Sequence, residues 1–281
     1  MSADLIPPAV RARLAGLRLV TRRASGAGGL GLHASRDRGV GLEFAQYRPY
    51  EPGDEPRQID WKLYARSDRF FVREAERESP VALWVLIDGS ASMAQRWAQA
   101  RGLAACLGEL ALAGGDRFGW AVMGKDGLAL ATPAAGVRQR DRLRRELATE
   151  RGAGRFPAAA RLAPLWERIA SRDLVVVLSD FFDDEAVAVT TRLADAGREV
   201  LAIQLLTVEE RDFAFAGGHR FRDPETGEEL LGDADGLRAD FLARFAAARA
   251  ALAAGWDAHG IRHATHVADE PLDAPLRVLF A

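Results

Sequence analysis

Two short, entirely apolar runs constrain the fold of this chain more than any other feature. Residues 81–87 read VALWVLI and residues 174–178 read LVVVL. Neither run alternates apolar with polar residues, so both are typical of strands that are buried on both faces of a parallel sheet. Both are also far shorter than the roughly 20 residues that cross a bilayer. The two runs therefore predict central strands of a parallel sheet.

Beyond residue 80 the sequence alternates between strand and helix patterns. Such alternation predicts a doubly wound α/β fold, a mostly parallel sheet flanked by helices. Functional sites in folds of this class form at the carboxyl ends of the strands. The expected strands cover residues 81–87, 117–123, 128–132, 174–178, 199–206 and 263–267, and the expected helices cover residues 94–113, 141–150, 159–171, 185–196 and 237–254.

The first 79 residues follow a different pattern from the rest of the chain. They begin with an arginine-bearing amphipathic stretch at residues 10–19. Turn-forming residues at 52–54 and a short strand pattern at 70–72 follow in a segment rich in aromatic residues. We therefore predict two parts, an N-terminal extension over residues 1–79 and an α/β domain over residues 80–281.

The charged residues argue against two classes of protein. Lys and Arg total 38 and Asp and Glu total 40, so the net charge of −2 gives no overall attraction for nucleic acid or anionic lipid. Lys62 and Lys125 are the only lysines, and neither lies in the glycine-rich loop that grips phosphates in P-loop ATPases. We expect neither a nucleic-acid partner nor P-loop chemistry.

The cysteine content and the hydropathy of the sequence indicate the cellular compartment of the protein. Cys106 is the only cysteine, which excludes an internal disulfide and a cysteine-based zinc site and is typical of a reducing compartment. The opening sequence MSADLIPPAVRARL has no apolar core of a signal peptide, and no apolar run is long enough for a transmembrane helix. The expectation is a cytoplasmic protein without a membrane span.

Acidic and hydroxyl side chains follow both apolar strands. Asp88, Ser90 and Ser92 come directly after the first, and Asp180 comes directly after the second. Their oxygens are hard ligands of the kind that Mg²⁺ and Mn²⁺ prefer. Asp and Ser after a strand also serve as ordinary helix N-caps, and for each residue taken singly that alternative stays open.

The pattern D-x-S-x-S at residues 88–92 resembles the metal-ion-dependent adhesion site of von Willebrand factor A domains. Three further segments resemble the bacterial family known as domain of unknown function 58. They read RPYEPGDEPRQIDWKLYARSDRFFVRE at 48–74, RFRDPETGEEL at 220–230 and DEPLDAPLRVLF at 269–280. The resemblance covers nearly the whole chain.

This resemblance implies a Rossmann-like von Willebrand factor A domain with the N-terminal extension packed on it. Carried over by position, Ser90 and Ser92 would bind the metal ion directly, and Asp88 and Asp180 would hold it mainly through waters. An acidic residue of a protein partner would complete the coordination. The family is associated with MoxR-type AAA ATPases, so the implied partner is such an ATPase or its client.

One departure from the pattern weakens the predicted metal site. A domains usually supply a threonine from the loop that precedes the second acidic strand end, whereas residues 152–164 read GAGRFPAAARLAP. Thr149 lies upstream of that stretch. The missing oxygen is replaced by a water, by Asp183 or by no ligand at all, and the sequence leaves these three alternatives open.

The function predicted from these features is that of a non-enzymatic adaptor that binds a protein partner through a Mg²⁺ or Mn²⁺ ion. The alternative is a Mg²⁺-dependent phosphotransferase of the haloacid dehalogenase type. In it Asp88 would be the nucleophile, and Asp180 and Asp184 would hold the ion. Against this alternative, Ser90 stands where the general acid should be.

Two further groups of residues invite a functional interpretation. The aromatic and arginine-rich segment from Tyr47 to Arg73 either packs on the α/β domain, with Arg–Asp pairs fixing its turns, or forms a partner surface. Its role stays open. His259, His263 and His266 lack the spacing of a zinc site, because a three-residue separation in a strand places His263 and His266 on opposite faces.

Overall fold

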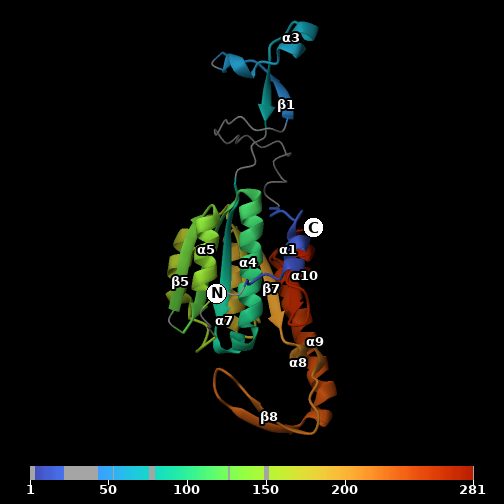
Figure 1. Cartoon of the computed structure of the whole chain (residues 1–281). Coiled ribbons are helices and arrows are strands. Elements are labelled where there is room, and N and C mark those ends of the chain that lie inside the picture. Colours follow the sequence, from blue (N-terminus) through green and yellow to red (C-terminus); the bar gives the residue numbers. More distant parts are fainter. Residues whose placement is uncertain are drawn as a thin grey trace. The chain divides into compact units, whose positions relative to one another are not determined.

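The computed structural model describes residues 4–21, 44–52, 54–75, 80–125, 127–148 and 152–280. The described residues form two units, residues 4–21 with 80–280 and residues 44–75 (Figure 1). The larger unit has a central sheet with helices on both faces, which confirms the predicted α/β fold class.

The sheet of the larger unit has six strands in the order β10-β7-β6-β3-β4-β5. All neighbours pair in parallel except β5, which runs antiparallel to β4. The strands are β3 (Ala82–Gly89), β4 (Arg117–Gly124), β5 (Gly127–Ala134), β6 (Leu174–Ser179), β7 (Glu199–Leu206) and β10 (Arg262–Val267).

Successive residues of β3 face two different halves of the core. Leu83, Val85 and Ile87 pack into one apolar cluster, and Trp84 and Leu86 pack into the other. Every residue of β3 is buried, so both faces of the strand need apolar side chains. This explains why the strand is an uninterrupted apolar run in the sequence.

Helices cover both faces of the sheet. The first cluster includes residues of α1 (Pro8–Leu14), α4 (Trp97–Gly114), α5 (Val137–Glu146) and α10 (Ala274–Phe280). The second includes residues of α6 (Ala163–Arg168), α7 (Asp184–Asp195) and α9 (Ala234–Ala258). No helix in the described part of the chain is both long and apolar enough to cross a membrane.

Several bounds differ from the predicted ones. The helix expected at 94–113 is divided into a 3₁₀ turn, η3 (Ala91–Arg96), and α4, and the helix expected at 159–171 is reduced to η4 (Ala159–Leu162) and α6. The stretch at 10–19 is helical only as far as Leu14. Short α8 (Val208–Asp212) and α10 were not predicted.

Two exposed strands also escaped prediction. They are β8 (Gly218–Arg222) and β9 (Glu229–Asp233), which pair as an antiparallel hairpin. None of their residues is buried. A hairpin without a buried face carries no apolar alternation in its sequence, so there was no pattern to find.

The N-terminal residues 4–21 belong to the larger unit rather than to the unit of residues 44–75. Ile6, Val10 and Leu14 are buried in the same apolar cluster as β3 and α4. The Arg13 guanidinium donates to both carboxylate oxygens of Asp273, at 2.7–3.0 Å, and lowers the pKa of that carboxyl through these hydrogen bonds. The first helix therefore contributes to the core of the α/β unit.

The smaller unit is built on an antiparallel pair of strands. β1 (Phe44–Pro49) pairs with β2 (Phe71–Ala75), and α3 (Trp61–Ser67) lies between them in the chain. The Arg48 guanidinium donates to both oxygens of Asp54 at 2.7 Å, an Arg–Asp pair within this unit that leaves both interpretations of the segment open. The rings of this unit contact one another, among them Tyr64 and Phe70, which stack with centroids 4.5 Å apart.

The buried position of Ile6 leads to the first prediction. Ile6→Ala removes a fully buried side chain from the main core, so we expect the free energy of unfolding to fall by about 2–5 kcal/mol. Val20→Ala, at a side chain 45% exposed, should change it by less than about 0.5 kcal/mol. Urea denaturation measures both. Equal effects of the two substitutions would contradict the packing of residues 4–21 described here.

Candidate metal site at the edge of the sheet

The candidate site lies where β3 and β6 end. The two strands pair in parallel with Ile87 opposite Leu178, so Asp88 and Asp180 leave the sheet at the same edge. In the sheet, β4 lies on one side of β3 and β6 lies on the other side. The strand order therefore reverses at β3, which makes the carboxyl ends of β3 and β6 a topological switch point. Sequence and topology together thus bring the predicted acidic residues to one place.

Asp88 is fully buried and both of its carboxylate oxygens accept hydrogen bonds. The Ser90 amide donates to Oδ1 at 2.8 Å, and the Ser179 hydroxyl donates to Oδ2 at 2.6 Å. Burial raises the pKa of Asp88 to about 6, against the lowering effect of these hydrogen bonds, and the negative charge of Asp180 raises it further. Asp88 is therefore held in one orientation at an energetic cost that a cation would relieve.

Ser90 and Ser92 lie side by side at the start of η3. Their Oγ atoms are 3.1 Å apart, and one hydroxyl donates a hydrogen bond to the other. Adjacent ligands of an octahedral Mg²⁺ at about 2.1 Å are separated by about 3.0 Å, so the spacing fits two neighbouring coordination positions. Ser90 occupies the N-cap position of η3, but its side chain makes no capping hydrogen bond. The ordinary capping role considered for Ser90 is thus wrong.

Asp180 has one satisfied and one unsatisfied carboxylate oxygen. Oδ1 accepts from the Phe182 amide at 3.1 Å, whereas Oδ2 accepts no hydrogen bond from the described residues, although the side chain is only 1% exposed. Its neighbour Phe181 has a positive φ of 58°, a conformation that costs energy for a bulky residue. The Phe181 ring packs on Trp256, with centroids 4.7 Å apart, which holds the turn after β6 in place.

Arg96 is a component of the site that the sequence did not reveal. This buried guanidinium lies 3.4 Å from Asp180 Oδ2 and donates to the Ser92 carbonyl and to Glu210. It also lies over the ring of Phe182. Arginine is frequent throughout this chain, so nothing in the sequence distinguished this one.

The loop that lacks the usual threonine does lie against the site, but through its backbone. The Ala153 amide donates to the Gly89 carbonyl at 3.2 Å, and the Ala91 amide donates to the Gly154 carbonyl at 2.8 Å. Gly152 permits this approach, since its φ is +115° and a Cβ there would be 2.6 Å from the Ala94 Cα. Residues 152–164 contain no Ser or Thr, so this loop offers no side-chain hydroxyl to the site.

Asp183 and Asp184 lie at the start of α7. The Asp183 side chain accepts from the Glu185 amide at 2.8 Å, so it acts as the N-cap of the helix. Asp184 is exposed in the first turn of α7. The described residues contain no group of three or more His, Cys, Asp or Glu side chains that could hold a metal, so a metal ion at this place would depend on the serine hydroxyls.

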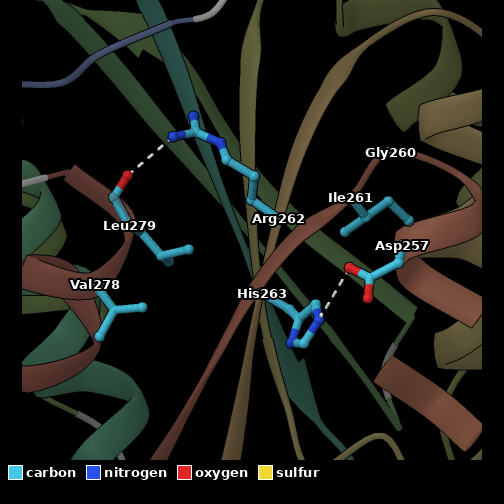
Figure 2. Close-up of a pocket in the computed structure, with 7 residues that line it drawn as sticks. All are labelled: Asp257, Gly260, Ile261, Arg262, His263, Val278 and Leu279. Atoms are coloured by element: carbon cyan, nitrogen blue, oxygen red, sulfur yellow. Dashed lines mark hydrogen bonds and ion pairs between the residues drawn. The ribbon is translucent and has the colours of Figure 1, made fainter. Parts of the chain in front are cut away.

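The three C-terminal histidines have separate partners. His259 Nδ1 is 2.6 Å from Asp195 Oδ1, His263 Nε2 is 3.4 Å from Asp257 Oδ1, and His266 is buried near the Glu270 carbonyl. His263 lines a pocket of about 350 Å³ with Arg262 and Leu279 (Figure 2). That pocket lies at the amino end of β10, so it belongs to the opposite edge of the sheet from Asp88.

The fold and the site together define an α/β protein with acidic and hydroxyl side chains gathered at the switch point of its sheet. The family model described as "Protein of unknown function DUF58" matches residues 46–251. The chain belongs to that family.

Comparison with curated proteins finds uncharacterised relatives in Mycobacterium bovis and Mycobacterium tuberculosis. Each is 27% identical over 263 residues, which covers 90% of this chain and 83% of the relative. Solved structures with some likeness include BatB from Bacteroides thetaiotaomicron, at 13% identity and a TM-score of 0.41, over 71% of this chain and 97% of that one. An aerotolerance-related membrane protein from Bacteroides fragilis has 16% identity and a TM-score of 0.42, over 71% and 96%. Likeness at such TM-scores does not establish a shared function.

The support that Ser179 gives to Asp88 can be measured. Ser179→Ala removes the hydroxyl that donates to Asp88 Oδ2 and leaves this buried oxygen unsatisfied. We expect the free energy of unfolding to fall by about 1–3 kcal/mol. In an Asp88→Asn background, the loss of unfolding free energy caused by Ser179→Ala should differ from the loss in the wild-type background by at least about 0.5 kcal/mol, because the two residues are in direct contact. Additive losses in the double-mutant cycle would contradict the contact.

Proposed function

We propose that this protein is a non-enzymatic binding module of the cytoplasm that engages a protein partner through a divalent cation, Mg²⁺ or Mn²⁺, at the edge of its sheet. The observation that carries the proposal is the pair of serine hydroxyls 3.1 Å apart beside two buried aspartates. Both serines and both aspartates offer the hard oxygens that these ions select.

Asp180 Oδ2 accepts no hydrogen bond from the described residues and has only an ion pair with Arg96 at 3.4 Å, which supports a further cation in this place. A buried carboxylate oxygen without a hydrogen bond is costly, and a bound cation or its water shell would satisfy it. In the proposed arrangement Ser90 and Ser92 bind the ion directly, and Asp88 and Asp180 hold it mainly through waters. When bound, the ion supplies a positive charge with an open position that a partner's carboxylate can occupy.

Arg96 limits how strongly the ion is held. Its guanidinium neutralises part of the charge of Asp180, and Glu210 in turn holds Arg96 in place. With this competing charge and with no threonine in the 152–164 loop, the chain supplies few ligands of its own. We therefore infer moderate affinity and dependence on an additional carboxylate.

The proposed partner presents an Asp or Glu side chain to the ion. A surface hollow of about 330 Å³, lined by residues that include Trp97, Arg101 and Gly152, adjoins the site and offers room for side chains next to that acid. Family resemblance is the basis for naming a MoxR-type AAA ATPase, or a client delivered to one, as the partner.

Asp88→Ala should weaken binding of such a partner in Mg²⁺ and have little effect in EDTA.

Cation binding itself is tested by titration with Mn²⁺. Wild-type protein should bind one ion and gain about 1.4 kcal/mol of stability when the free ion is at tenfold the dissociation constant. Ser90→Ala/Ser92→Ala and Asp88→Asn should lose this gain, measured by calorimetry and by thermal unfolding.

Asp240→Asn is the matched control, because Asp240 is an exposed aspartate in α9. It should bind Mn²⁺ as the wild type does. Retention of saturable binding by the double serine variant would contradict the proposed site.

The phosphotransferase alternative makes a different prediction. A nucleophilic aspartate must reach its substrate, yet Asp88 is fully buried and both of its oxygens accept hydrogen bonds. We expect no turnover of p-nitrophenyl phosphate in Mg²⁺. Turnover that is abolished by Asp88→Asn would overturn the non-enzymatic proposal and establish the alternative.

A further inference from the structure

The smaller unit, residues 44–75, has almost no apolar core of its own. Among its described side chains, Val72 is the only apolar one that is buried. The other apolar side chains described in this unit are partly or largely exposed. A two-stranded hairpin is only marginally stable by itself, so a unit of this kind gains stability when another surface covers its apolar side chains.

Four aromatic rings of this unit contact one another and form an aromatic cluster, which consists of Tyr50, Trp61, Tyr64 and Phe70. Tyr64 and Phe70 stack with centroids 4.5 Å apart, and the Trp61 ring meets both nearly at right angles, with centroids 6.1 and 6.3 Å away. Trp61 is nevertheless 59% exposed and Phe70 is 44% exposed. The cluster is therefore an exposed apolar surface of the kind that marks interaction sites.

Local hydrogen bonds hold the cluster in one arrangement. The Asp60 carboxylate accepts from the Lys62 and Leu63 amides at 2.9 and 3.0 Å, and so it caps the start of α3. The Tyr50 amide donates to the Phe70 carbonyl at 2.9 Å. Rings on a fixed backbone lose little conformational freedom when a partner covers them, which favours binding.

Three exposed cations accompany the rings. They are Lys62, Arg66 and Arg69, whose side chains have no hydrogen bond or ion pair within the described part of the chain. Lys62 and Arg66 are four residues apart on α3, the helix that carries two of the rings, and Arg69 directly precedes Phe70. Asp68 is the only acidic residue among residues 61–70. This part of the unit thus combines exposed rings with an excess of unpaired positive charge.

Rings beside unpaired cations are complementary to a partner that offers carboxylates and apolar side chains together. Charge favours a short acidic segment over a long polyanion, because residues 44–75 hold six basic and six acidic residues and have no net charge. Stacking of nucleic-acid bases is also disfavoured, since Tyr64 and Phe70 each use one ring face on the other.

We propose that the aromatic cluster, together with Lys62, Arg66 and Arg69, is a docking surface for an acidic segment of a protein in which Asp or Glu residues lie among Leu or Phe residues. It is a second interaction surface, and it needs no metal ion. Of the two interpretations that the sequence left open for the segment from Tyr47 to Arg73, this proposal adopts the partner surface.

The test measures peptide binding by the full-length chain in EDTA, which removes any contribution of a metal ion. The probe is a fluorescein-labelled peptide of about a dozen residues in which Asp and Glu alternate with Leu and Phe, and its counterpart carries Lys at the acidic positions. Fluorescence anisotropy gives the dissociation constant of each. We expect the acidic peptide to bind at least about tenfold more tightly than the basic one, and added salt should weaken its binding.

Two variants separate the rings from the charges. Trp61→Ala removes the most exposed ring of the cluster and should weaken binding of the acidic peptide by at least about tenfold. Arg66→Gln leaves every ring in place and removes one unpaired charge, so it should weaken binding by roughly threefold and reduce the salt dependence. Arg66 is exposed, so this variant decides the question if Trp61→Ala unfolds the smaller unit. Leu231→Ala is the matched control, because Leu231 is 72% exposed in the larger unit, and it should bind as the wild type does.

The outcomes decide between the possible occupants of this surface. Equal binding of the acidic and basic peptides, or unchanged binding by a folded Trp61→Ala or by Arg66→Gln, would overturn the proposal. Absence of binding would also overturn it and would leave packing on the α/β unit as the interpretation of the segment. Tighter binding of single-stranded DNA or of anionic lipid vesicles than of the acidic peptide would overturn it in favour of a nucleic acid or a membrane.

This inference and the proposed function fail separately. Ser90→Ala/Ser92→Ala should bind the acidic peptide as the wild type does, because the docking surface does not use the ion. Loss of peptide binding in that variant would overturn the independence of the two surfaces and, with it, this proposal.

Discussion

The parallel pairing of β3 with β6 is the constraint on which the rest of the structure depends. Both strands are buried on both faces, so their register is fixed by apolar packing in two directions at once. A shift by one residue would exchange the two core clusters and turn Asp88 away from Ser179. Because the pairing is parallel, the chain must leave both strands at the same edge, and the polar residues that follow are brought together there.

Burial of two carboxylates at that edge has consequences for the surrounding residues. The Ser90 amide and the Ser179 hydroxyl satisfy Asp88, the Phe182 amide satisfies half of Asp180, and Arg96 offsets part of its charge. Among the described residues, Asp180 Oδ2 accepts no hydrogen bond and has only the ion pair with Arg96. The arrangement retains a surplus of negative charge and of oxygen ligands, which a divalent cation would balance.

The sequence was most informative where burial imposed a pattern. The runs at 81–87 and 174–178 predicted the central strands, and the rule that sites follow parallel strands predicted Asp88, Ser90, Ser92 and Asp180 as neighbours. Arg96 could not be found, since its role comes from an interaction with Glu210, 114 residues away. The β8–β9 hairpin could not be found either, because an exposed hairpin leaves no apolar periodicity in the sequence. The core role of Ile6 was hidden as well, because Ile6 lies before α1 and belongs to no periodic apolar pattern.

The most direct test of the account is anomalous diffraction from crystals grown with Mn²⁺, recorded where manganese scatters anomalously. The account predicts one strong peak within coordination distance of Ser90 Oγ and Ser92 Oγ. A well-ordered sheet edge without a peak, with the Arg96 guanidinium occupying the space between Ser92 and Asp180, would contradict it. In that case the arginine, and not a metal ion, would be the cation that these carboxylates require.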